Sequence, residues 1–77
     1  MASFTYDDFR TVLTRIGFEK VRSEKHETWR KVLPSGAILR VRISHLHKRD
    51  IPKWLFHEML RQAGLTSDEF RRVLRES

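Results

Sequence analysis

The chain has 77 residues and no cysteine, so we expect one domain over residues 1–77, without disulfides or thiolate zinc sites to support the fold. Its 16 Lys and Arg residues against 10 Asp and Glu give a formal net charge of +6. This excess favours a polyanionic partner, most simply nucleic acid, although a well-solvated basic surface is the alternative.

The first predicted element is a helix in residues 4–18. Thr5 and Asp8 have the spacing of a capping box at its start, and Gly17 is a natural stop. Apolar residues recur at i, i+3, i+4 and i+7, as on the buried face of an amphipathic helix: Phe9, Val12, Leu13 and Ile16.

Three strands are predicted next, because the apolar pattern changes from helical to alternating. Residues 18–25 form a short first strand, with Phe18 and Val21 directed inward. Residues 26–44 form a hairpin that turns at the Pro-Ser-Gly sequence of residues 34–36. Along its second limb, alternation separates Ala37, Leu39, Val41 and Ile43 on one face from Ile38, Arg40, Arg42 and Ser44 on the other.

The same alternation assigns the residues of the first limb to two faces. Trp29 and Leu33 are expected on the buried face, together with Leu39 and Val41. By parity, the opposite face carries His26, Thr28 and Arg30, beside Arg40 and Arg42. His26 is therefore predicted on an exposed sheet face, at the edge of an arginine cluster.

Two further helices are predicted in residues 51–64 and 65–77. Pro52 suits the first turn of the former, Gly64 ends it, and its apolar stripe is Leu55, Phe56, Met59, Leu60 and Ala63. The last helix begins with a capping box of Thr66 and Glu69, and its apolar edge is Phe70, Val73 and Leu74. The order α-β-β-β-α-α predicts an α+β fold of two layers, a three-stranded antiparallel sheet with helices on one face. The other sheet face is left bare.

No part of the sequence predicts export or a membrane span. The first ten residues contain two Asp and no apolar run, unlike a signal peptide. The apolar stretches fall far below the roughly 20 residues that a membrane helix requires. We therefore expect a soluble, cytoplasmic protein with no membrane partner.

His26 is the candidate catalytic residue, although a lone strand histidine is more often structural or incidental. A histidine side chain ordinarily titrates near ~6.5, so it can accept or donate a proton at neutral pH. Arg30, Arg40 and Arg42 could hold a phosphodiester and stabilise the charge that grows on its oxygens. RNA carries its own nucleophile, the 2′-OH, so no metal or cofactor is expected.

A basic run before the second predicted helix is the candidate phosphate grip. The N-terminus of that helix favours anions, so we favour phosphate contact over a merely solvated loop. The predicted RNA-binding residues here are His45, His47, Lys48, Arg49 and Lys53, with Lys25 next to His26. The H-x-H pair could hold a metal, but the sequence nearby supplies no convincing third ligand.

The two tryptophans are expected to differ. Trp29 is predicted in the core, whereas Trp54 lies off the apolar stripe of its helix and is predicted to be partly exposed. An exposed Trp54 could stack on a base or anchor a protein partner.

Several short motifs resemble the HicA (YcfA-like) family of bacterial mRNA-cleaving toxins. They are the helix ending "RIGFEKVR", the histidine three residues before an aromatic in "HETW", the "PSG" turn and the H-x-H stretch. The second helix begins "IPKWLFHEML" and continues to "RQAGLTSDEF", close to the family's usual ending. The resemblance covers nearly the whole chain, and it rests on the order of these pieces rather than on any one of them.

The resemblance implies a fold similar to the double-stranded RNA-binding domain and a metal-independent endoribonuclease activity on mRNA. It also implies that His26 matches the family's essential histidine, and that a HicB-like antitoxin binds the toxin and blocks that residue. The chain departs from the family at Glu24-Lys25-His26-Glu27, where members usually have Gly-Ser-His, often followed by a second His. Either acid could hold a proton on His26 or repel an RNA phosphate.

Two other functions are compatible with the sequence. A non-catalytic RNA-binding module of the same fold would bind RNA in a salt-sensitive way without cutting it. A protein-interaction domain would instead use its basic face to dock an acidic partner. The oligomeric state cannot be read from the sequence.

Overall fold

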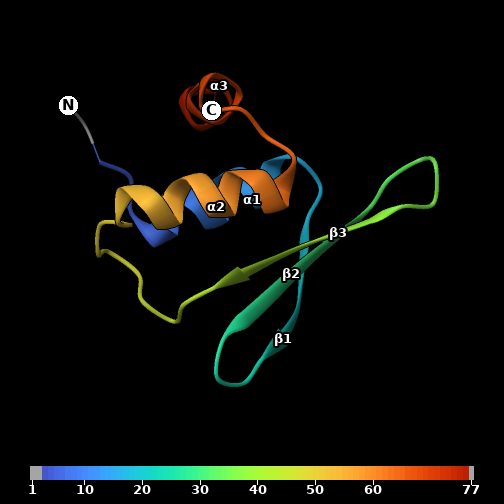
Figure 1. Ribbon diagram of the computed structural model, residues 1–77, viewed down its shortest axis with the longest axis horizontal. Helices are drawn as coiled ribbons and strands as arrows, with labels where there is room; N and C mark the ends of the chain where they lie inside the picture. The colour runs from blue at the N-terminus through green and yellow to red at the C-terminus, as the bar shows by residue number, and fades with distance from the viewer. Residues whose placement is uncertain (1–2, 77) are drawn as a thin grey trace.

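The computed structural model describes residues 3–76, and its elements follow the predicted order. They are α1 (Tyr6–Arg15), β1 (Glu19–Ser23), β2 (Glu27–Val32), β3 (Ile38–Ile43), α2 (Lys53–Ala63) and α3 (Ser67–Arg75). The strands form one antiparallel sheet in the order β1-β2-β3, and Figure 1 shows the helices gathered on one side of it. The predicted α+β fold is confirmed. None of the described helices has the length and apolar character needed to cross a bilayer.

The helices begin and end where the sequence signals lie. Both predicted capping boxes are present, with the Thr5 hydroxyl accepting from Asp8 N at 3.1 Å and the Thr66 hydroxyl accepting from Glu69 N at 3.1 Å. Gly64 follows α2 with a φ of 71°, a left-handed conformation that glycine adopts without steric cost. Pro52 stands one residue before α2, as its N-cap.

The core lies between the helices and the inner face of the sheet. Four aromatic rings from the start of the chain, α1, α2 and α3 pack together with centroids 4.9–6.0 Å apart: Phe4, Phe9, Phe56 and Phe70. Trp29, Val41 and Ile43 contribute the sheet side of the core. Trp29 is thus buried as predicted, and Trp54 is 73% exposed on α2, also as predicted.

A β-bulge in β1 overturns one prediction about the first strand. The pairing with β2 runs from Lys20 opposite Trp29 directly to Arg22 opposite Thr28, so Val21 is the extra residue. Val21 is 47% exposed and does not face the core, contrary to the prediction, whereas Phe18 is buried just before the strand. The bulge also shifts Arg22 onto the same face as Thr28, because directly paired residues of antiparallel strands share a face.

The two edges of the sheet have different surroundings. At the β3 edge, α2 packs alongside, and Gln62 Oε1 accepts a hydrogen bond from the Arg42 backbone N–H at 3.2 Å. Gln62 is held in turn by its own bond to Glu58 Oε2, 3.2 Å long. At the other edge, all five residues of β1 are exposed, and no described strand pairs with its outer side.

Candidate active site and nucleic-acid interface

The sheet face turned away from the helices, here called the open face, is strongly cationic. The register pairs Arg30 with Arg40 and Thr28 with Arg42 across β2 and β3. All four arginines on this face are exposed, and they are Arg22, Arg30, Arg40 and Arg42. Glu19, opposite Arg30, places one carboxylate on the same face. Such a surface suits a polyanion, because guanidinium groups donate in a planar fork that matches phosphate oxygens.

His26 lies in the loop between β1 and β2, immediately before β2 begins at Glu27. Its side chain is exposed, and its Nδ1 atom lies 3.3 Å from Nη2 of Arg42. The structure therefore brings His26 to the end of the open face, next to one of the arginines that the sequence predicted beside it. An imidazole and a guanidinium thus lie within hydrogen-bond distance of each other on the exposed surface.

Glu27, the residue after His26, is turned to the opposite side of the sheet and is only 5% exposed. Its carboxylate accepts hydrogen bonds from Arg10 Nε at 2.9 Å, Arg10 Nη2 at 3.1 Å and Trp29 Nε1 at 3.0 Å. Burial raises the pKa of Glu27, but the bonds from Arg10 and Trp29 outweigh it and hold the pKa below its ordinary value. The Glu27 carboxylate therefore stays ionised and paired with Arg10 on the inner side of the sheet, away from the open face.

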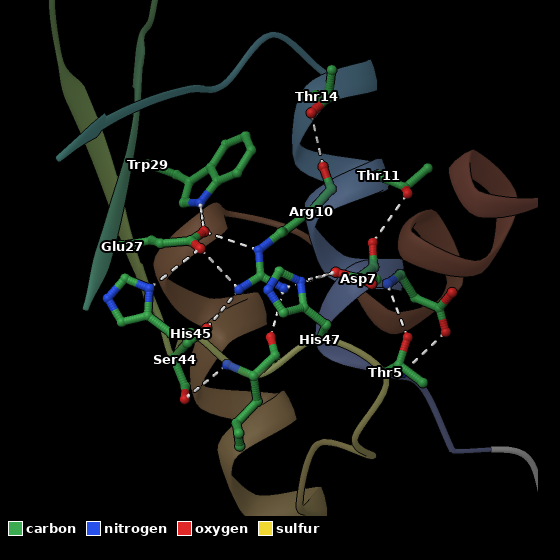
Figure 2. Close-up of polar contacts among 12 residues, drawn as sticks. Thr5, Asp7, Arg10, Thr11, Thr14, Glu27, Trp29, Ser44, His45 and His47 are labelled. Carbon is green, nitrogen blue, oxygen red and sulfur yellow. Dashed lines mark hydrogen bonds and ion pairs between the residues drawn. The ribbon is translucent and has the colours of Figure 1, made fainter. Parts of the chain in front are cut away.

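Arg10 of α1 connects Glu27 to two other parts of the chain. Its Nη1 donates to Asp7 Oδ1 at 3.0 Å and to the Leu46 carbonyl at 2.7 Å, and its Nη2 also donates to the Ser44 carbonyl at 2.6 Å. Together with the two bonds to Glu27, these account for all five N–H groups of the guanidinium, whose side chain is 13% exposed. Figure 2 shows these bonds converging on Arg10.

Sequence reasoning did not identify the Arg10–Glu27 pair. The signal was nevertheless present, because Glu27 has the same strand parity as the buried Trp29. A carboxylate at an inward position requires a partner, and an arginine on a core-facing helix is the usual candidate. The missing information was which helix lies opposite, and only the fold supplies it.

His45 and His47 contact protein groups rather than each other. His45 Nε2 donates to the Glu24 carbonyl at 2.5 Å, and its Nδ1 lies 3.7 Å from Glu27 Oε2. His47 Nδ1 lies 3.0 Å from Asp7 Oδ1 (Figure 2). Among residues 3–76, no group of three potential ligands could hold a metal ion. The pair thus joins the loop after β3 to the β1–β2 loop on one side and to α1 on the other.

The other predicted phosphate-binding residues are exposed, and they are Lys25, Lys48, Arg49 and Lys53. The loop that carries Lys48 and Arg49 is held by its backbone, because the first-turn N–H groups of α1 donate to it. Tyr6 N donates to the Arg49 carbonyl at 3.2 Å, and Asp7 N donates to the His47 carbonyl at 3.0 Å. The carbonyls therefore face α1, while the two cationic side chains remain available to solvent.

One family of known proteins matches most of the chain. The family model described as "HicA toxin of bacterial toxin-antitoxin" matches residues 6–65 of the 77-residue chain. The comparisons with curated proteins and with solved structures returned no match. The matched range runs from the start of α1 through α2 and includes His26, the open face and the Arg10–Glu27 pair. The chain therefore belongs to the HicA toxin family of bacterial toxin–antitoxin systems.

Proposed function

We propose that the protein is an endoribonuclease toxin that cleaves mRNA, with His26 as general acid/base and the open face as the RNA-binding surface. The observation that carries this proposal is the exposed His26 ring at the edge of the open face, 3.3 Å from the Arg42 guanidinium. Family membership supports the toxin role, and the chemistry of these side chains supports RNA as the target.

The reaction would use the nucleophile of the substrate itself. The 2′-OH of one ribose would lose its proton to His26 as its oxygen bonds to the adjacent phosphorus, and the bond to the 5′-oxygen of the next nucleotide would break as His26 gives the proton to that oxygen. His26 would carry a proton in this exchange, and the arginines would stabilise the charge that accumulates on the phosphoryl oxygens. No step requires a metal or a cofactor.

The departure from the family sequence around His26 has a structural compensation. Glu27 is paired with Arg10 on the inner side of the sheet, so its charge is removed from the proposed RNA path. Glu24 is exposed, so its carboxylate stays in solvent, and the His45 bond holds its backbone carbonyl in place. This arrangement supports retained catalysis over the alternative of a purely RNA-binding module.

The toxin is proposed to act in the cytoplasm, and its partner there is proposed to be a HicB-like antitoxin. An antitoxin that covers the open face would meet the exposed arginines and also the exposed apolar pair of Val32 and Ile38, which face each other across β2 and β3. Acidic and apolar side chains on the partner would complement this surface. Lys48, Arg49 and Lys53 are proposed to extend the RNA contact beyond the sheet.

The decisive experiment is incubation of the purified protein with mixed mRNA in EDTA, beside His26→Ala. We expect fragments from the wild type alone, and an unchanged circular dichroism spectrum for the variant because His26 is exposed. Equal cleavage by both proteins would remove His26 from the mechanism. RNA binding by both proteins without cleavage would favour the binding-module function instead.

A further inference from the structure

We propose that Arg42 and His45, together called the loop clasp, are positioning residues that hold His26 in place and fix which ring nitrogen carries its proton. This proposal rests on the proposed function of His26, and it reassigns His45 from RNA contact to support of the catalytic loop. Both residues come from β3 or the segment directly after it, and they contact the β1–β2 loop at two different points.

His45 holds the backbone of the loop. A carbonyl oxygen only accepts hydrogen bonds, so the 2.5 Å contact with the Glu24 carbonyl requires a proton on His45 Nε2. The other nitrogen of the same ring is 3.7 Å from the Glu27 carboxylate, on the far side of His26 in the chain. Glu27 is itself fixed by Arg10 and Trp29. The ring of His45 thus contacts both ends of the segment 24–27, which contains His26.

The backbone of the loop has few other restraints. Apart from strand pairing, no backbone–backbone hydrogen bond among residues 3–76 involves Lys25 or His26. The nearest strand pair is Ser23 with Glu27, which closes the loop at its base. The contact from His45 therefore supplies order that the hairpin itself does not provide.

Arg42 holds the ring of His26. A guanidinium has only donors and stays charged, so its Nη2 must donate to Nδ1, which therefore lacks a proton. In the neutral ring the proton is then on Nε2, and Nδ1, beside the Arg42 guanidinium, is the nitrogen that can accept a proton. Arg42 is itself well placed for this role, because its backbone N–H is bound by Gln62 from α2.

The first test measures the clasp in the RNA-free protein, independently of any cleavage. Backbone ¹⁵N relaxation should give order parameters near ~0.85 for Lys25 and His26 in the wild type, falling below about 0.6 in His45→Leu. The variant His45→Gln should restore order, because its amide N–H can donate to the Glu24 carbonyl. The matched control His47→Leu should leave both values unchanged, since His47 contacts α1 instead. Rigid amides in His45→Leu, or equal loosening in His47→Leu, would overturn the role of His45.

The second measurement reads the tautomer from the imidazole ¹⁵N shifts of His26 at a pH where the ring is neutral. The wild type should show a protonated Nε2 and an unprotonated Nδ1, and Arg42→Met should give a mixture of tautomers. Arg40→Met removes the same charge from the same face and should leave the tautomer unchanged. A proton on Nδ1 in the wild type, or the same mixture in both variants, would overturn the role of Arg42.

Cleavage kinetics then separate positioning from RNA binding. Displacing His26 should lower kcat by up to about 100-fold in His45→Leu while KM changes little. A residue that only grips RNA would raise KM and leave kcat unaltered, and that result for His45→Leu would refute the clasp. If the wild type cleaves no RNA, the proposed function fails, and the two spectroscopic measurements still decide whether the clasp exists.

Discussion

Replacement of Arg10 by Met is the most direct test of the physical basis of this fold. Met preserves the unbranched stem but removes every donor, so Glu27 keeps only the Trp29 bond and the more distant His45 as partners. Breaking a buried ion pair by removing one partner costs about 3–5 kcal/mol, because an uncompensated charge is left inside. A chain of 77 residues has roughly 4–12 kcal/mol of stability in total, at ~0.05–0.15 kcal/mol per residue.

The assay is urea unfolding at pH 7 of the wild type, Arg10→Met, Glu27→Gln and the double variant. In the double variant, the amide that replaces the Glu27 carboxylate carries no charge and can still accept from Trp29, so this protein should be more stable than Arg10→Met alone. If the losses of unfolding free energy in the two single variants add up to the loss in the double variant within about 0.5 kcal/mol, Arg10 and Glu27 are not coupled. That result, or a loss below about 1 kcal/mol in Arg10→Met, would refute the argument.

Two further predictions concern acid stability and RNA binding. Because the pKa of Glu27 is held below its ordinary 4.5, its contribution to stability is present above about pH 4.5 and is lost as the pH falls through the lowered value. The unfolding free energy should therefore fall less steeply with decreasing pH in Glu27→Gln than in the wild type. Identical slopes would contradict a lowered pKa of Glu27 in the folded protein. Separately, the double variant of Lys48→Ala and Arg49→Ala should weaken RNA binding and reduce the salt slope by roughly 1.4, at ~0.7 per phosphate of single-stranded RNA. The matched double variant of Arg72→Ala and Arg75→Ala on α3 loses the same charge and should keep the slope, so equal losses in the two would remove the proposed grip.

The features that the sequence predicted correctly depend on neighbours in the chain. A capping box such as that of Thr66 and Glu69 is a contact between residues three apart, and strand parity follows from the pleat alone. These local rules were enough for the order of elements and for the exposed position of His26 next to Arg42. They describe most of the fold and the centre of the candidate site.

The features that the sequence did not predict depend on contacts between distant segments. The bulge at Val21 is a mismatch in length between β1 and β2, so alternation within β1 alone could not reveal it or the placement of Arg22. Arg10 and Glu27 are 17 residues apart, and nothing in the sequence of either segment identifies the other residue as its partner. The roles of His45 and His47 have the same origin, since their partners lie in the β1–β2 loop and in α1.

The unequal edges of the sheet have a consequence for how the protein meets other chains. At the β3 edge, α2 packs alongside and Gln62 binds the Arg42 backbone N–H, so β1 is the more open of the two edges. There the bulge at Val21 distorts the row of backbone groups, and Lys20 and Arg22 place like charges on either side of it. Bulges and charges of this kind discourage edge-to-edge pairing, so the exposed β1 edge is a poor template for a strand of another copy. This feature lowers the tendency of the protein to polymerise through the β1 edge of its own sheet.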